Sequence, residues 1–193
     1  MNVSQTIETE ENLLPCLRIK IYHPQQSTKG LYGLLPLGNR SRHSAEDLLR
    51  LGRDNQACTF ALADIRVSRK QLSLQAYRAP HSADMLFTIQ NLSQKARLSV
   101  NSTALDYLER TDLPDKALIR FGEYEMLIFR ESGEAKGSFE VEFEVLAAPP
   151  SRETCLCSPS VTAIMDTGSS CGLMSFPVTQ GPLESDETFI YHS

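Results

Sequence analysis

Two segments of the chain alternate between apolar and polar residues, and this repeat restricts the fold more than any other feature of the sequence. Residues 139–145 carry Phe or Val at every second position with Glu between them, and residues 17–22 alternate Leu or Ile with Arg, Lys or Tyr. A two-residue repeat is typical of a β-strand with one buried face, because an amphipathic helix repeats every 3.6 residues. The apolar face of such a strand is buried only if a second layer of secondary structure packs against its sheet. We therefore expect two packed β-sheets or a closed barrel.

Shorter apolar runs between these two segments predict further strands, separated by polar or glycine-containing turns. Gly122-Glu123 indicates a hairpin between the last two runs, and Ser44–Asp47 matches the cap of a single helical turn. Many short strands with closely spaced turns predict an all-β sandwich or barrel. The shorter runs are residues 48–51, 59–62, 71–77, 85–90, 98–100, 117–121 and 125–129.

The composition divides the chain into three parts. Residues 1–14 contain three acids and no base, whereas residues 15–148 contain the strand pattern and two more bases than acids. From 149 to 193, 21 of the 45 residues are Ser, Thr, Pro or Gly, a composition that does not build an apolar core. We therefore expect one domain over residues 15–148, a flexible acidic segment before it and a disordered tail after it.

Composition also excludes several classes of protein. A formal net charge of -5 argues against a basic surface for duplex DNA, so we expect no nucleic-acid partner. The start lacks the basic and apolar regions of a signal peptide and no window approaches about 18 apolar residues, so we expect a cytoplasmic protein with no membrane partner. Its five cysteines are then free thiols. Cys155, Cys157 and Cys171 lack the spacing of a four-ligand zinc site, so no metal is expected.

Two matches to enzyme motifs fall in the predicted tail. Residues 164–170 resemble the aspartic-protease loop around Asp166, and residues 168–172 fit G-x-S-x-G around Ser170. The first pattern has one Asp where that chemistry uses two, and the second lacks a strand before it and a helix after it. We therefore expect no enzyme activity and no cofactor. A hydrolase that uses Asp166 or Ser170 is the alternative, and it requires a protected core in this stretch.

Polar residues gather at the ends of three predicted strands, where the loops of a sandwich meet. The pairs are Gly52-Arg53 and Ser68-Arg69, and Asn91 begins a third loop that also carries Lys95. A phosphothreonine carries about -1.5 to -2 charges and three acceptor oxygens. Arg, Ser and Lys side chains on these loops would give it charge-assisted hydrogen bonds worth about 1.5 to 3 kcal/mol each.

A simpler interpretation of Arg53 is a surface ion pair with Asp54 or Asp64. Such exposed pairs contribute only about 0 to 1 kcal/mol. This alternative needs no ligand. It requires that one of the two carboxylates lies within ion-pair distance of the Arg53 guanidinium in the fold.

In their order and spacing these motifs resemble the forkhead-associated (FHA) family, phosphothreonine-binding β-sandwiches with Gly-Arg, Ser-x-x-His and Asn motifs on neighbouring loops. The resemblance implies a phosphothreonine site of Gly52, Arg53, Ser68, Arg69, Asn91 and Lys95, in which Asn91 binds the backbone of the ligand. Two residues depart from the pattern. Gln71 stands in place of the His, which usually braces the fold, and Gln90 stands where we would expect a basic residue.

Further segments are similar to the TRAF-interacting FHA adaptors within that family: residues 22–24, 112–114 and 120–124. This resemblance implies that Thr9 is phosphorylated by an alpha-kinase and bound by the FHA site of another copy, and that the protein dimerises and then forms larger oligomers. It also implies that Pro182, Glu184 and Glu187 form a peptide motif for a TRAF-family ubiquitin ligase. The expected output is NF-kappa-B activation in innate immunity. The alternative is an FHA module that binds a different phosphothreonine protein and has an inert tail.

Overall fold

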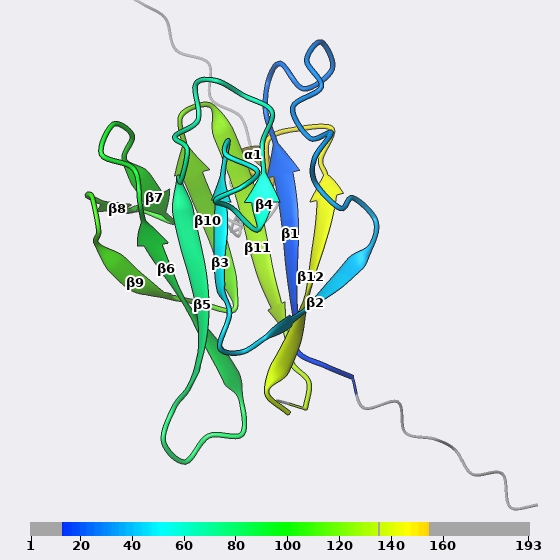
Figure 1. The fold of residues 1–193 in the computed structure, drawn as a ribbon, viewed down its shortest axis with the longest axis vertical. Helices are drawn as coiled ribbons and strands as arrows, with labels where there is room; N and C mark the ends of the chain where they lie inside the picture. The colour runs from blue at the N-terminus through cyan, green and yellow to red at the C-terminus, as the bar shows by residue number, and fades with distance from the viewer. Residues whose placement is uncertain (1–12, 135, 155–193) are drawn as a thin grey trace, which may run out of the picture. The chain divides into compact units, whose positions relative to one another are not determined.

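The computed structural model describes residues 13–134 and 136–154 of the 193-residue chain. Strands dominate this part of the chain, and a single short helix follows the last strand (Figure 1). The strands are β1 (Cys16–Tyr22), β2 (Arg40–Ser44), β3 (Leu48–Gly52), β4 (Phe60–Ala61), β5 (Leu72–Arg78), β6 (Met85–Asn91), β7 (Leu98–Val100), β8 (Thr103–Leu105), β9 (Arg110–Leu113), β10 (Lys116–Phe121), β11 (Tyr124–Glu131) and β12 (Ser138–Val145), and the helix is α1 (Ser151–Thr154).

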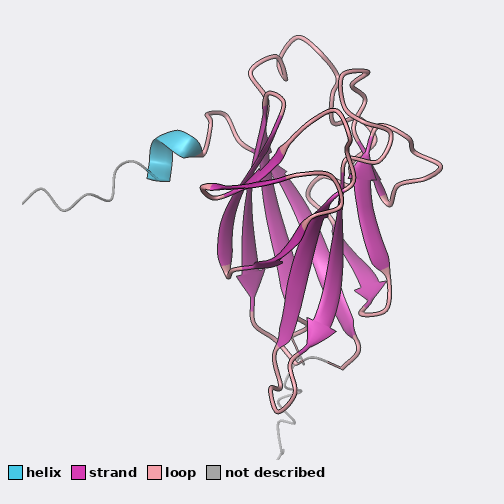
Figure 2. Ribbon diagram, turned by 90° about the vertical axis from the view of Figure 1, so that its left-hand side faces the viewer, coloured by secondary structure: helices cyan, strands magenta, loops and turns pink. Residues whose placement is uncertain are grey.

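The strands form two sheets that face each other (Figure 2). The larger sheet has the order β2-β12-β1-β11-β10-β7-β8, and the smaller sheet has the order β4-β3-β5-β6-β9. Neighbouring strands are antiparallel except in the pairs β1–β12 and β3–β4, which are parallel. This arrangement confirms the predicted all-β sandwich of mostly antiparallel strands.

Aromatic side chains join the two sheets across the core. Phe60 in β4 of the smaller sheet meets Phe143 in β12 of the larger sheet with ring centroids 4.8 Å apart. Phe87 in β6 contacts Phe139 in β12 in the same edge-to-face manner at 5.0 Å. The apolar positions of β1 and β12 are buried as the two-residue repeat predicts, because both strands lie inside the larger sheet; the exception is Val145 at the end of β12, which is 37% exposed.

Three strands carry no clear repeat in the sequence, and the sequence analysis missed them: β2, β8 and β9. Each lies at the edge of a sheet, where one side of the strand has no partner. An edge strand needs little apolar surface, so its pairing is set by its neighbour and not by its own pattern. The helical turn expected at Ser44–Asp47 is also wrong. The Asp47 N–H donates to the Ser44 carbonyl at 3.0 Å in a turn between β2 and β3.

The chain enters the sandwich at a fixed point. The Leu13 carbonyl accepts a hydrogen bond from the Glu134 N–H at 2.8 Å, just before β1 begins. After β12, the N–H and hydroxyl of Ser151 donate to the Glu125 carboxylate at 3.0 Å, so α1 packs near β11. The predicted tail thus begins with one ordered turn, while the domain boundary at residue 148 stays a prediction. No described helix is both long and apolar enough to cross a lipid bilayer.

Candidate functional site

Three loops, which follow β3, β4 and β6, form a groove of about 910 Å³ on the sandwich. Arg66 in its wall lies 3.0 Å from the ring of His23, the residue directly after β1. The groove is therefore at the end of the sandwich where β1 finishes. Its charged lining residues are Arg53, Asp54, Arg66, Arg69, Lys70 and Lys95.

The groove carries an excess of positive charge that the described carboxylates do not neutralise. Arg53, Arg69, Lys70 and Lys95 are exposed, and none of the four forms an ion pair with a described residue. Asp54 is the one acid among the lining residues. The simpler interpretation of Arg53 as half of a surface ion pair is therefore wrong for the described carboxylates. Unpaired cations around a hollow attract an anionic ligand.

Gly52 holds two of these loops against each other. A Cβ atom added at this buried glycine would lie 2.3 Å from the Arg69 carbonyl oxygen, a distance that no ordinary contact reaches. The close approach allows the Arg53 N–H to donate to the Ser68 carbonyl at 3.1 Å and the Asp54 N–H to donate to the Arg69 carbonyl at 3.2 Å. Only glycine fits here, because any side chain would overlap the Arg69 carbonyl. The close approach places the backbone of Arg53 beside that of Ser68.

A pair of serine hydroxyls joins the second loop to the third. Ser68 and Ser93 lie 2.7 Å apart at their hydroxyl oxygens. Ser93 is buried, and its hydroxyl oxygen also accepts the N–H groups of Lys95 at 3.3 Å and Ala96 at 3.0 Å. The sequence analysis did not assign Ser93 to the site. Its position two residues after Asn91 was the available signal, and only the fold shows that it meets Ser68.

Asn91 lies behind the groove and not in its wall. The side chain is 1% exposed, and its amide nitrogen donates to the carbonyls of Leu105 at 2.9 Å and Ala96 at 3.2 Å. Its side-chain oxygen accepts the Ser93 N–H at 3.0 Å. Both amide hydrogens are therefore used inside the protein. In this structure Asn91 fixes the loop between β6 and β7, and its predicted contact with ligand backbone remains a prediction.

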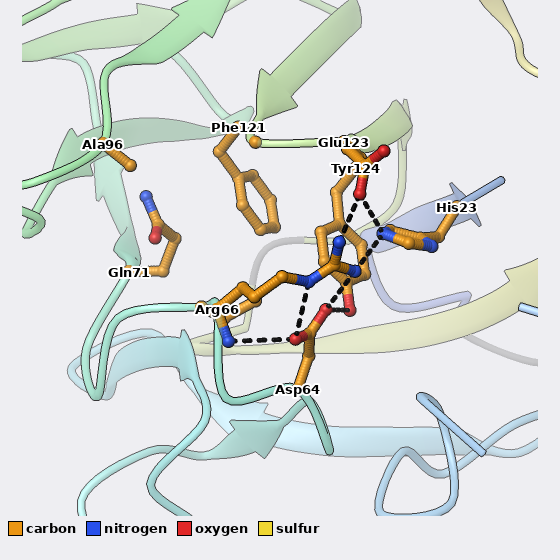
Figure 3. Close-up of a pocket in the computed structure, with 10 residues that line it drawn as sticks. His23, Asp64, Arg66, Gln71, Ala96, Phe121, Glu123 and Tyr124 are labelled. Carbon is orange, nitrogen blue, oxygen red and sulfur yellow. Dashed lines mark hydrogen bonds and ion pairs between the residues drawn. The ribbon is translucent and has the colours of Figure 1, made fainter. Parts of the chain in front are cut away.

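A cluster of charged side chains lies next to the groove, around a pocket of about 110 Å³ (Figure 3). At its centre the Arg66 guanidinium donates to both oxygens of Asp64, at 3.2 and 3.0 Å, and also pairs with Glu123. The Tyr124 hydroxyl donates to Asp64 at 3.0 Å. His23 is fully buried beside Arg66. The cluster joins the groove loop after β4 to the hairpin between β10 and β11.

Two groups in this cluster have shifted pKa values. Burial alone would raise the pKa of Asp64, but hydrogen bonds from Arg66 and Tyr124 outweigh it and lower the pKa to about 2. Burial, with the adjacent Arg66 charge, lowers the pKa of His23 below its usual value. Nδ1 of the His23 ring accepts the Gln25 N–H at 3.0 Å, and Nε2 lies 3.0 Å from the Arg66 guanidinium and 3.6 Å from the Glu123 carboxylate. Neutral His23 and ionised Asp64 thus hold the cluster together.

Gln71, which stands in place of the histidine of the FHA pattern by resemblance, lines the smaller pocket. It is 1% exposed, and its side-chain oxygen accepts the Ser68 N–H at 3.4 Å. Its side-chain nitrogen has no hydrogen-bond partner within the described chain. Gln71 therefore braces Ser68 from inside.

The structure brings four of the predicted binding residues into the groove wall, namely Arg53, Ser68, Arg69 and Lys95. Lys70 lines the same groove and was not predicted. Among the described residues no cluster of three potential metal ligands exists. The remaining predicted sites lie outside the described residues. They are Thr9, Pro182, Glu184 and Glu187, together with Asp166, Ser170 and the three cysteines of the tail.

Comparisons with known proteins agree with this fold. The sequence profile of the FHA domain matches residues 49–122, which contain all three groove loops. The human TRAF-interacting protein with FHA domain-containing protein A is 36% identical over 143 residues, 74% of this chain and 77% of the relative. The rat protein of that name is 34% identical over 149 residues, which cover 77% of this chain and 80% of the rat protein. The chain belongs to the family of TRAF-interacting proteins with an FHA domain.

Among solved structures, the FHA domain of an Arabidopsis thaliana hypothetical protein is 23% identical to this chain. The match covers 64% of this chain and 90% of that one, with a TM-score of 0.44.

Proposed function

We propose that the groove binds phosphothreonine and that the protein is a non-enzymatic signalling adaptor. The observation that supports this most directly is a set of four cations that line the groove together with Ser68 and form no ion pair with a described residue. A phosphothreonine supplies the missing negative charge, and each charge-assisted hydrogen bond contributes about 1.5 to 3 kcal/mol. An unmodified threonine offers one hydroxyl and no charge, so its binding should be weak. Phosphorylation then acts as the switch.

The ligand in this proposal is Thr9 of another copy of the chain. The Leu13 carbonyl is fixed at the start of β1, and four residues span at most about 14 Å between it and Thr9. The groove lies past the other end of β1, whose seven residues extend about 20 to 23 Å. This difference supports binding between copies and argues against binding within one chain.

Such a contact joins two different surfaces, the N-terminal segment of one copy and the groove of the next. A heterologous contact of this kind leaves a free segment and a free groove at the ends, so assembly continues beyond a dimer. The kinase in this proposal is an alpha-kinase. A dimer that exists before phosphorylation also belongs to the proposal, as the family resemblance implies.

The C-terminal part of the proposal is recruitment of a TRAF-family ubiquitin ligase in the cytoplasm. Pro182, Glu184 and Glu187 provide the predicted peptide motif, and the relatives are named for their interaction with TRAF proteins. One short peptide binds weakly, but many copies on an oligomer raise its effective concentration. NF-kappa-B activation in innate immunity is the proposed result.

The test measures the size of the full-length protein by size-exclusion chromatography with light scattering, before and after phosphorylation of Thr9. We expect large oligomers for the wild type, and none for Arg53→Ala or Thr9→Ala. Arg78→Ala is the matched control, because Arg78 is an exposed arginine at the end of β5 and lies outside the groove lining. It should assemble like the wild type. A phosphorylated wild type that keeps its starting size, or an Arg53→Ala variant that still assembles, contradicts the proposal.

Thr9→Ala also separates the two adaptor interpretations. If the protein instead recognises a different phosphoprotein, the variant still binds that protein and the phosphorylated wild type does not assemble.

A further inference from the structure

Ile65 is the most exposed of the large apolar side chains that the structure describes, and it lies in the wall of the cationic groove. Its exposed fraction is 87%, whereas Val67 in the same wall is 5% exposed. Exposed apolar residues are common on protein surfaces, but this one belongs to a concave site lined otherwise by cations, polar groups and small or less exposed apolar residues. Its position suggests contact with a ligand.

The backbone around Ile65 is firmly held. The Val67 N–H donates to the Asp64 carbonyl at 3.2 Å, and this makes a turn with Ile65 at its second position. The Arg66 N–H donates to the Asp64 carboxylate at 2.9 Å, and that carboxylate is fixed in turn by Tyr124. Ile65 therefore projects from an ordered turn, and a ligand that contacts it loses little free energy to ordering of the protein.

We propose that Ile65 determines the specificity of the groove by packing against an apolar residue two positions before the phosphothreonine, namely Ile7 of a second copy. This inference rests on the proposed function. In an extended peptide, side chains two residues apart point to the same side and are about 6.6 to 7 Å apart. A segment bound in this way would turn Ile7 and Thr9 towards the groove together and Glu8 and Glu10 towards the opposite side.

The same two-residue spacing places Glu11 on the side of Ile7 and Thr9. The segment thus presents an apolar, a phosphorylated and an acidic side chain in a row. The groove lining includes Ile65, Arg53, Ser68 and further cations. Charge alone accepts many acidic phosphopeptides, whereas an apolar contact at a fixed distance from the phosphate selects among them.

The test is a double-mutant cycle with the unphosphorylated full-length protein and a peptide of residues 1–15 that carries phosphothreonine at position 9. Affinities are measured by fluorescence anisotropy for wild-type protein and Ile65→Ala, each with the wild-type peptide and with Ile7→Ala. We expect each single change to weaken binding about 3- to 10-fold, in keeping with the loss of a few buried methyl or methylene groups. The two changes together should weaken binding no more than one of them alone, because they remove the same contact.

Two matched controls accompany the cycle. Leu48→Ala removes another exposed apolar side chain outside the groove lining, and Val3→Ala shortens a peptide residue far from Thr9. Both should change affinity less than twofold. A thermal melt of Ile65→Ala should match the wild type, because an exposed side chain contributes little to the core.

Two results overturn the inference and leave the proposed function in place. The first is that Ile65→Ala binds the peptide with wild-type affinity. The second is that the loss of affinity for the two changes together equals the product of the two single losses. A third result has a different meaning. If the phosphorylated and plain peptides bind equally, or neither binds, the proposed function fails and the Ile65 contact fails with it.

Discussion

Replacement of Gly52 by alanine tests how the groove is built. The added Cβ would lie 2.3 Å from the Arg69 carbonyl oxygen, where ordinary contacts begin at about 3.4 Å, so the loop must move by about 1 Å. That movement stretches the two backbone hydrogen bonds that tie Arg53 to Ser68 and Asp54 to Arg69. Overpacking costs about 1 to 3 kcal/mol, and the two bonds, which are stretched and not broken, together add about 1 kcal/mol. We expect Gly52→Ala to lower the free energy of unfolding by about 2 to 4 kcal/mol.

Urea denaturation of the full-length protein measures this loss, as a fall of about 1 to 2 M in the unfolding midpoint. Gly30→Ala is the matched control, since a Cβ at Gly30 meets no atom within 4 Å. We expect its free energy of unfolding to stay within about 0.5 kcal/mol of the wild type or to rise slightly. Equal stability of the two variants would show that the loops do not depend on the close approach at Gly52. Phosphopeptide affinity should fall for Gly52→Ala alone.

Two further predictions concern buried polar groups. Asn91→Ala leaves the Leu105 carbonyl without its side-chain donor and frees the loop before β7. Urea denaturation should therefore show that the free energy of unfolding falls by about 1 to 3 kcal/mol. A variant as stable as the wild type would contradict the role given to Asn91. His23 has a lowered pKa in the folded state, so its stabilising contribution is complete above the unfolded value of 6.5 and is lost as pH falls below it. Between pH 7.5 and 5 the wild type should lose stability in urea, and His23→Gln should lose less; an equal loss refutes the argument. The Asp64 carboxylate affects stability over a lower pH range. Its stabilising contribution is complete above its unfolded pKa of 3.8 and is lost as the pH falls towards its folded pKa of about 2.

The sequence predicted the inner strands far better than the edges of the sheets. β1 and β12 lie between two neighbours, and every second side chain is buried over residues 17–21 and 139–143, so their pattern records their environment. β2 has five polar or basic residues and pairs only with β12. Its hydrogen bonds come from its position beside β12, and no local pattern encodes that position.

The site was predictable in part for a similar reason. Arg53 and Ser68 stand at the ends of recognisable strands, so their loops were expected to meet. The charged cluster was not expected, because Arg66 pairs with Glu123 across 57 positions of the chain and with His23 across 43. Nor does the sequence show that the amide of Asn91 is used inside the protein, since that depends on where the carbonyl of Leu105 arrives.

The parallel pairing of β1 with β12 also affects biosynthesis. β1 lies between β11 and β12, so it leaves the ribosome about 100 residues before the first of its two partners begins. At 5 to 20 residues per second, β1 waits about 6 to 25 seconds for them. During that time its unpaired edges are open to other nascent chains. Newly made protein should therefore depend on chaperones until Val145 has emerged, and truncation before β12 should give aggregates and not a smaller folded domain.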